Sequence, residues 1–327
     1  MRFILHIGIN KTGTSSLQRT LSNNADALRA LDICYPETGR GGGAAHHDLS
    51  RALKGMPAER FGLPPAWREA FLAEAESCAT CVVSSEDFAT MPDPAKAATL
   101  FPPGETQVVV YLREHLRHLA SWYQQAIHSR AVCLDFDEFA RNYRKDFHPV
   151  LDRWKQVFGA RNLLVRQYDR ATLEDGDIVR DFLAHAIPEA QGKLTPVPGE
   201  ANPSLAGNLL FAKLLLNLTQ PQDLAQGRTL TELAALTKLD ASFRGSVPVA
   251  AETVARLRRL TRPDREALAR DHGFRFEPPM GAIDGPAYPD LTRLRDDLEL
   301  LRDGARKRGF QVTRLIDRLL DAFAPAA

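Results

Sequence analysis

The sequence has little cysteine, no surplus of charge of either sign and no long apolar run. Four cysteines in 327 residues are too few for a disulfide scaffold. Lys and Arg number 42 and Asp and Glu 41, so the net charge of +1 excludes a polybasic nucleic-acid coat or an acidic tail as the organising feature. No stretch approaches the roughly 20 apolar residues of a membrane-spanning helix, and the first apolar run, residues 3–7, is too short for a signal sequence. These absences predict a reduced, cytoplasmic protein that binds no nucleic acid and has no transmembrane segment.

The composition is that of a globular protein, with 44% hydrophobic and 25% charged residues. Cys78 and Cys81 have the spacing of a redox or zinc half-site. Because no second pair accompanies them and an apolar run follows directly, they are predicted to be ordinary, partly buried thiols.

Short β-prone runs alternate with segments of helical periodicity over the first 190 residues. After the run at residues 3–7, a helix is predicted from Thr14, with leucines at helical spacing at Leu17, Leu21, Leu28 and Leu31. Further strands are predicted at residues 81–85, 107–112 and 162–168, and further helices from about Leu49, over residues 116–123 and over residues 178–183. This alternation is typical of an α/β fold with a central, mainly parallel sheet flanked by helices, which binds ligands at the carboxyl ends of its strands.

The rest of the chain reads as mostly helical. A stretch rich in Pro and Gly, Pro196–Pro203, marks the transition, and a late stripe of leucines predicts core packing at Leu291, Leu294, Leu298 and Leu301. We expect a single domain over residues 1–327, in which residues 1–190 form a nucleotide-binding α/β core and residues 191–327 a largely helical C-terminal region. The oligomeric state does not follow from the sequence.

The segment Gly8–Ser16 (Gly-Ile-Asn-Lys-Thr-Gly-Thr-Ser-Ser) joins the first strand to its helix. Backbone N–H groups and the helix dipole make such a loop an anion site. Its two glycines are five residues apart, as in a Walker A loop, but Lys11 precedes Gly13 by two residues instead of following it. The loop therefore predicts anion binding without the nucleoside-triphosphate motif; the alternative is a tight turn with a surface lysine.

The loop resembles the phosphosulfate-binding loop of sulfotransferases that use 3′-phosphoadenosine 5′-phosphosulfate (PAPS), which reads Lys-Ser/Thr-Gly-Thr-Thr/Ser after the first strand. The second motif of that family is an Arg that ends a later strand and a Ser one or two turns into the next helix. Arg113 and Ser121 match it in type and spacing. Tyr168 looks like the tyrosine of a family strand that ends near the adenine, although a core tyrosine is an equal alternative.

The resemblance covers residues 3–185, is closest in loop style to bacterial and carbohydrate-modifying members, and implies a P-loop NTPase-like sulfotransferase fold. It implies that PAPS is the sulfate donor, that an unidentified hydroxyl or amine, such as one on a glycan or glycolipid, is the acceptor, and that no metal is required. The Arg-Lys-Gly motif that cytosolic members carry late in the chain is missing, and Arg244-Gly245 is its nearest counterpart.

The resemblance also implies residue roles. Lys11 would stabilise the charge that develops on the bridging oxygen during transfer. The 5′-phosphate would be held by the loop residues Thr12, Gly13, Thr14, Ser15 and Ser16, through their N–H groups and the hydroxyls of Thr14 and Ser15. Arg113 and Ser121 would bind the 3′-phosphate, which ATP lacks.

The general base has several candidates. Glu86 ranks first because it follows the strand before Arg113, where cytosolic relatives carry a catalytic His; a solvated loop carboxylate is the alternative. His47 ranks second, near the place where carbohydrate-modifying relatives have a catalytic Glu. His46 and Glu37 are weaker choices.

Two other functions compete with sulfuryl transfer. A P-loop kinase or nucleoside triphosphatase would need a Lys directly after the second glycine, which is missing, and a metal-binding acid at a strand end, for which Glu86-Asp87 is a partial substitute. A non-catalytic nucleotide-binding module would use Lys11 to bind an anion but place no base beside an acceptor.

Overall fold

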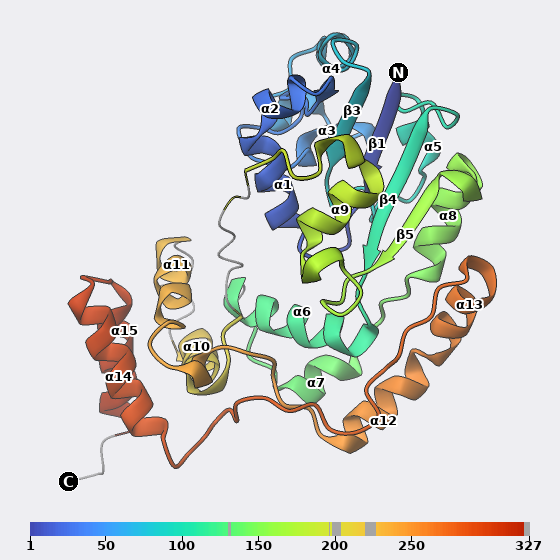
Figure 1. Ribbon diagram of the computed structural model, residues 1–327. Helices are drawn as coiled ribbons and strands as arrows, with labels where there is room; N and C mark the ends of the chain where they lie inside the picture. The colour runs from blue at the N-terminus through green and yellow to red at the C-terminus, as the bar shows by residue number, and fades with distance from the viewer. Residues whose placement is uncertain (130–131, 196, 198–203, 220–226, 324–327) are drawn as a thin grey trace. The chain divides into compact units, whose positions relative to one another are not determined.

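The computed structural model describes the chain apart from residues 130–131, 196, 198–203, 220–226 and 324–327, and its contacts divide the chain into two compact units (Figure 1). The sheet unit comprises Met1–Glu114, Asp146–Ala201 and Asp264–Phe276; the helical unit comprises His115–Lys145, Asn202–Pro263 and Glu277–Ala327. Pro196–Pro203, the expected transition, lies outside the described residues except for Val197. The single domain over residues 1–327 stays a prediction.

Among the described residues, five strands form one sheet in the order β2-β3-β1-β4-β5: β1 (Arg2–His6), β2 (Ile33–Cys34), β3 (Thr80–Ser84), β4 (Thr106–Leu112) and β5 (Leu163–Gln167). All neighbouring strands are parallel, and Leu5 at the centre lies opposite Val83 and Val108. The carboxyl ends of the strands therefore meet at one edge. The predicted α/β fold with a parallel central sheet flanked by helices is confirmed.

Helices cover both faces of the sheet (Figure 1). The sheet unit contains α1 (Thr14–Asn23), α2 (Ala25–Arg29), α3 (His47–Leu53), α4 (Trp67–Ala75), α5 (Ala95–Ala98), α8 (His148–Phe158), α9 (Ile178–Ala186) and most of α13 (Arg262–His272). Successive strand residues point to opposite faces, so Ile4 packs with α1, α2 and α9, whereas Leu5 packs with α3, α4, α5, α8 and α13. Short 3₁₀ turns of this unit lie at Ala58–Phe61, Ala160–Asn162, Glu174–Gly176 and Pro188–Ala190, and the helical unit has one at Ala241–Phe243.

The helical unit has a core of its own. Its helices are α6 (His115–Ser129), α7 (Phe136–Arg141), α10 (Gly207–Thr219), α11 (Gly227–Leu236), α12 (Ala251–Leu260), α14 (Leu294–Lys307) and α15 (Val312–Ala322). Buried side chains from α6, α10, α14 and α15, among them Tyr123, Leu209, Leu298 and Ile316, form one cluster. Across the described part of the chain, no helix combines the length and the apolar character needed to cross a bilayer.

Two helix predictions were wrong at their boundaries. The helix from Thr14 does not run on to Leu31 but ends at Asn23. The amide group of its C-cap residue, Asn24, exchanges hydrogen bonds of 2.9 Å with the backbone of Thr195. The leucine stripe begins at Leu294, because Leu291 precedes α14 and is 74% exposed. Asp290 explains this break, since its carboxylate accepts hydrogen bonds from the backbone and hydroxyl of Thr292 and so forms a turn.

Candidate functional site

The loop between β1 and α1 presents backbone donors at the carboxyl edge of the sheet. Gly13 is the N-cap of α1, and its carbonyl accepts hydrogen bonds from the N–H groups of Ser16 (3.1 Å) and Leu17 (3.3 Å). No side chain caps this end, and its first turn contains no acidic residue. The N–H groups that precede Ser16 at the start of an α-helix have no intrahelical acceptor, so they and the helix dipole favour an anion here.

The side chain of Thr12 and the backbone of Lys11 show how the loop holds its shape. The buried Thr12 hydroxyl donates a hydrogen bond of 2.6 Å to the Ile9 carbonyl, and so closes the loop on itself. Lys11 has a φ of 70°, in the left-handed region. That conformation costs an L-residue about 1 kcal/mol, and such strain is typical of functional loops.

Both glycines of the loop are at points of close approach. A Cβ atom on Gly8 would lie 2.8 Å from Thr14 Cγ2 and 3.3 Å from Glu86 Cα. A Cβ atom on Gly13, where φ is +75°, would lie 2.8 Å from Tyr168 Cε2 and 3.1 Å from Ile178 Cγ2. The loop is therefore packed between the segments that follow β3 and β5.

Arg113, directly after β4, contacts the loop. Its Nη1 donates a hydrogen bond of 3.2 Å to the Lys11 carbonyl, and its guanidinium carbon lies 5.7 Å from the centroid of the Tyr168 ring. Burial lowers the pKa of Lys11, and the positive charge of Arg113 lowers it further. Like charges disfavour each other, so a multiply charged anion bound beside both residues would stabilise the charged form of Lys11.

Glu86, two residues after β3, lies against α1. One carboxylate oxygen accepts a hydrogen bond of 3.3 Å from the Thr14 hydroxyl, and the other accepts one of 2.8 Å from the Gln18 amide. Gln18 was not predicted as a site residue. The available signal was its spacing of four residues from Thr14, which places both side chains on one face of α1.

His47 is the first residue of α3 and lies beside the same segment as Glu86. Its Nδ1 makes a hydrogen bond of 2.8 Å with the Ser85 hydroxyl and lies 3.7 Å from an Asp87 carboxylate oxygen. That oxygen also forms an ion pair with Arg51, at 3.0 Å from Nε. The side chain of His47 is about one-third exposed (34%) and can reach solvent or a ligand.

The two weaker base candidates are held elsewhere. His46 is buried, and its Nδ1 accepts the Ser84 N–H (3.2 Å) while its Nε2 donates to the Pro36 carbonyl (2.9 Å). Burial lowers the pKa of His46 to about 3, so it is a neutral, structural side chain. Glu37 is 88% exposed and pairs with Arg40 at 3.7 Å.

The remaining predicted nucleotide-binding residues differ in their exposure and in the unit that contains them. Ser15 is exposed and Ser16 half-buried on the first turn of α1. Tyr168 continues β5, donating its N–H to the Leu112 carbonyl (2.7 Å). Ser121 is buried on α6 and Arg244 is exposed, both in the helical unit. The roles predicted for Ser121 and Arg244 stay predictions.

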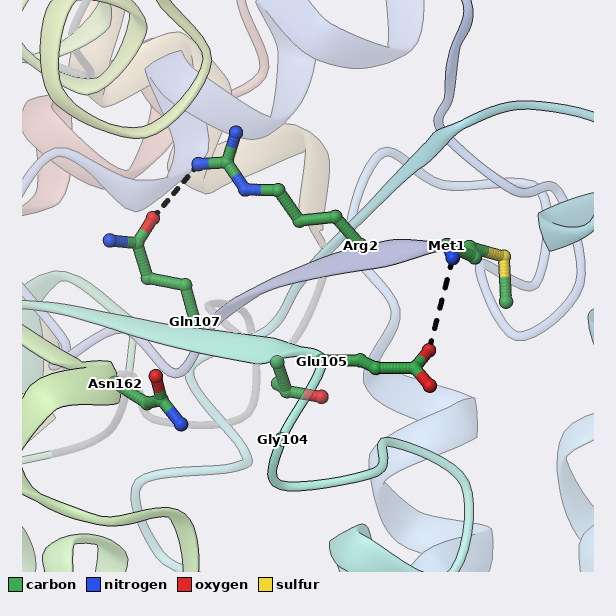
Figure 2. Close-up of a pocket in the computed structure, with 7 residues that line it drawn as sticks. Met1, Arg2, Gly104, Glu105, Gln107 and Asn162 are labelled. Carbon is green, nitrogen blue, oxygen red and sulfur yellow. Dashed lines mark hydrogen bonds and ion pairs between the residues drawn. The ribbon is translucent and has the colours of Figure 1, made fainter.

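A polar hollow of about 420 Å³ lies at the opposite edge of the sheet, where the strands begin (Figure 2). Its lining includes Arg2 and Gln107, joined by a hydrogen bond of 3.2 Å, and Glu105, which lies 4.0 Å from the N-terminal ammonium of Met1. Parallel α/β sheets bind their ligands at the carboxyl edge. The loop at that edge is therefore the stronger candidate site.

Fold and loop together define a parallel α/β protein whose sheet is covered on both faces and whose first strand is followed by a loop of geometry that suits an anion. No family model matches the chain. An uncharacterised protein of Archaeoglobus fulgidus is 34% identical over 125 residues, which are 36% of this chain and 33% of that protein, so the match spans about a third of the relative's length. Among solved structures, the chain is similar to a sulfotransferase from Alicyclobacillus acidocaldarius, with 14% identity and a TM-score of 0.42 over 83% of this chain and 95% of that one.

Proposed function

We propose that this protein is a PAPS-dependent sulfotransferase that transfers a sulfuryl group to a hydroxyl or amine acceptor. The observation that carries the proposal is the contact of Arg113 with the Lys11 carbonyl, 3.2 Å long. It joins two motifs that are 102 residues apart in the sequence. Two adjacent cations beside an uncapped helix N-terminus suit a nucleotide that carries phosphate groups at two positions.

The nucleotide-binding roles follow from the loop and its neighbours. The 5′-phosphate would accept hydrogen bonds from the N–H groups at the start of α1 and from the hydroxyl of Ser15. Arg113 would bind the 3′-phosphate. The Tyr168 ring, which packs beside Gly13 and Arg113, would contact the base or ribose.

The transfer step needs a cation and a base. The acceptor oxygen or nitrogen forms a bond to sulfur while the bond from sulfur to the 5′-phosphate oxygen breaks, and adenosine 3′,5′-bisphosphate leaves with that electron pair. Lys11 would stabilise the charge on the leaving oxygen. Glu86 would take the acceptor proton, held in place by Thr14 and Gln18. His47 is the second candidate base.

One observation favours a second function. The Thr14 hydroxyl lies 3.3 Å from a carboxylate oxygen of Glu86. In P-loop nucleoside triphosphatases, a hydroxyl of the loop and an acid at a neighbouring strand end hold Mg²⁺ together. This pair would suit a nucleoside triphosphate with Mg²⁺, although Lys11 is not at the Walker position.

Nucleotide preference separates the two functions. Thermal unfolding is followed with adenosine 3′,5′-bisphosphate, ADP and ATP, each with and without Mg²⁺, because a ligand raises apparent stability by RT ln(1 + [L]/Kd). We expect the bisphosphate to stabilise the protein most, independently of Mg²⁺. Arg113→Ala should weaken bisphosphate binding by about 10- to 100-fold, since a charge-assisted hydrogen bond is lost, and should remove the preference over ADP.

Arg161→Ala is the matched control, because Arg161 is an exposed arginine just before β5, at the other edge of the sheet. It should bind the bisphosphate as the parent does. A parent protein stabilised most by ATP with Mg²⁺ would overturn the sulfotransferase proposal and favour the triphosphatase.

Lys11 and Glu86 are expected to act on transfer more than on binding. Lys11→Ala should lower kcat by about 100-fold, the typical cost of removing one charge-stabilising group, and Glu86→Gln should lower kcat without weakening bisphosphate binding. Release of the bisphosphate from PAPS is measured with a panel of glycan and glycolipid acceptors.

Lys193→Ala removes an exposed lysine of the sheet unit and is the control, expected to retain full activity. Equal turnover by Lys11→Ala and the parent would contradict the role of Lys11. Tight bisphosphate binding without transfer to any acceptor would instead favour a binding module.

A further inference from the structure

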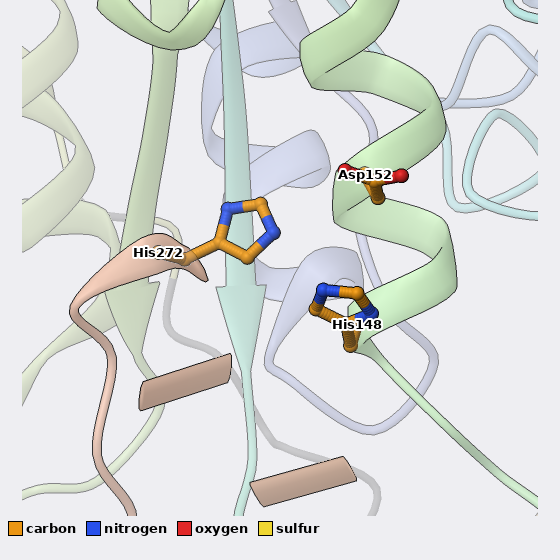
Figure 3. A group of neighbouring side chains, drawn as sticks. All are labelled: His148, Asp152 and His272. Atoms are coloured by element: carbon orange, nitrogen blue, oxygen red, sulfur yellow. The ribbon is translucent and has the colours of Figure 1, made fainter. Parts of the chain in front are cut away.

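Three side chains outside the candidate site converge on one point of the sheet unit. His148 and Asp152 lie on α8, and His272 is the last residue of α13. Each offers one metal-ligating atom, and these atoms all lie within 4.8 Å of one another. Figure 3 shows the three side chains as neighbours, with His148 and Asp152 on one helix and His272 on a separate segment.

Local structure brings these residues together. His148 and Asp152 are four residues apart, so they share one face of α8. Asp264, near the start of α13, accepts hydrogen bonds from the N–H groups of Phe147 (3.0 Å) and His148 (2.9 Å), and so ties α13 to the N-terminus of α8. The rings of His148 and His272 pack edge to face, with centroids 5.5 Å apart.

Each of the three side chains keeps a donor atom available. One carboxylate oxygen of Asp152 accepts a hydrogen bond of 2.7 Å from the Gln156 amide, so the second oxygen remains for a metal ion. His148 forms a hydrogen bond of 2.8 Å with Asp271 through Nε2, so Nδ1 remains. Among the described residues, Nε2 of His272 is buried and makes no hydrogen bond. A buried polar atom without a partner is uncommon, and a bound ion is one physical explanation of it.

We propose that His148, Asp152 and His272 bind a divalent transition-metal ion of the zinc class. Two imidazoles and one carboxylate suit zinc and its neighbours better than Mg²⁺ or Ca²⁺, which prefer oxygen ligands. Three protein ligands leave room for a water molecule in a tetrahedral site. Zinc bonds of about 2.0–2.2 Å require the ligand atoms to approach by about 1 Å, which half-buried side chains on two helices achieve by small rotations.

Asp271 completes the proposed site. Ligating histidines generally donate their other ring N–H to a carboxylate, which fixes the tautomer and orients the ring. The hydrogen bond between His148 Nε2 and Asp271 is of that kind, and Arg270 holds the carboxylate with two hydrogen bonds of 2.8 Å. Lys155 lies nearby, where its ammonium bonds the backbone carbonyl of Asp271 at 3.3 Å, and the carboxylates of Asp152 and Asp271 counter its repulsion of a cation.

The ion would stabilise the sheet unit and take no part in transfer. After Ala201 the chain runs through the helical unit and returns at Asp264. The returning helix, α13, contributes Leu268 to the core of the sheet unit. The hydrogen bond from the His148 N–H to Asp264 already joins α8 to α13 across 116 residues of sequence. A metal ion shared by the two helices would add a second tie between these distant segments.

Metal binding is tested on the full-length protein after treatment with a chelator. Zn²⁺ is titrated by calorimetry, Co²⁺ by its visible absorption, and thermal unfolding is followed with and without Zn²⁺. We expect one ion per chain, a cobalt spectrum of four- or five-coordinate type, and a higher Tm with Zn²⁺. Asp152→Asn and His272→Ala should each weaken binding by more than about tenfold and remove the Tm increase, and Asp271→Asn should weaken it by about 10- to 100-fold.

His185→Ala is the control, because His185 is a half-exposed histidine on α9 of the same unit, and it should bind Zn²⁺ as the parent does. Asp152→Asn keeps the shape of the side chain, so its metal-free Tm should equal that of the chelated parent, which separates lost binding from misfolding. A parent that binds neither ion, or variants at Asp152 and His272 that bind as tightly as the parent, would overturn the proposal.

Discussion

Gly13 is the residue at which loop conformation and packing meet. Its φ of +75° disfavours any side chain, and a Cβ atom would lie 2.8 Å from the ring of Tyr168. Gly13→Ala should therefore destabilise the fold by about 2 kcal/mol, from left-handed strain plus the clash. Because the clash displaces the loop, bisphosphate affinity should also fall by about tenfold or more. Urea unfolding and thermal shift with the bisphosphate measure the two effects.

Gly62 provides a matched control for the backbone strain. Its φ is +70°, and a Cβ atom there would meet nothing within 4 Å. Gly62→Ala should cost about 1 kcal/mol and leave nucleotide affinity unchanged. If the two alanine variants behaved alike in both measurements, the packing of Tyr168 on Gly13 would have no part in shaping the loop.

Residue spacing in the sequence is enough to single out Lys11 and Arg113, because each lies at a fixed distance from the end of a strand. The structure places Arg113 in contact with the Lys11 carbonyl. Gln18 is different, because its partner Glu86 is 68 residues away and no local pattern pairs them. The two adjacent histidines show the same limit. Only the start of α3 decides that His46 is buried against Pro36 while His47 stays partly exposed.

At the scale of the elements, a buried polar network attaches α9 to the sheet. Its buried Asp181 accepts hydrogen bonds from Tyr111 on β4 (2.7 Å) and from Arg166 on β5 (3.0 and 2.5 Å), and the Glu174 N–H adds a fourth (3.1 Å). The same helix supplies Ile178, which packs beside Gly13. The position of α9 therefore supports the loop.

Asp181→Asn should destabilise the protein by about 3 kcal/mol, because it leaves the partly buried Arg166 without its counter-charge. Arg180→Ala, one residue earlier, removes an ion pair with Asp175 in which both side chains are more than 60% exposed. That change should leave the unfolding free energy nearly unchanged. Urea unfolding of both variants is the measurement, and a similar stability for the two would show that the Asp181 network contributes nothing.

Most elements of the sheet unit can be predicted because their signals are local. The strands β3, β4 and β5 begin and end within one or two residues of the predicted runs at 81–85, 107–112 and 162–168. The end of α1 could not be predicted, because the side chain that ends it, Asn24, bonds Thr195, 171 residues later. Element boundaries fixed by distant partners are not encoded in periodicity.

At the scale of the whole molecule, the two units are interleaved along the chain. Each is assembled from three separate segments, so neither can be excised as one continuous piece. We therefore expect one cooperative unfolding transition, as the predicted single domain requires. A titratable group buried in one unit and a spectroscopic probe in the other can test this.

Lys213 on α10 is such a group. It lies 1% exposed in the helical unit, where its ammonium donates to the Ile127 carbonyl (2.9 Å) and to Asn217. Burial lowers its pKa from 10.5 to about 8. Below pH 8 both folded and unfolded chains keep this proton. Between pH 8 and 10.5 only the unfolded chain keeps it, so the unfolding free energy should rise with pH in that range, by about 1.4 kcal/mol per pH unit.

The comparison of the parent with Lys213→Met isolates this contribution, since the variant lacks the group and should lose the rise. Tryptophan fluorescence in a Trp122→Phe background reports the sheet unit alone, because Trp67 and Trp154 lie there and Trp122 lies on α6. Both proteins carry Trp122→Phe, and their unfolding is followed by fluorescence. From about pH 8 to about pH 9.5, the unfolding free energy of the protein with Lys213 should rise by about 2 kcal/mol more than that of Lys213→Met. A gain seen by circular dichroism but not by fluorescence would mean that the units unfold independently, and would refute the single domain.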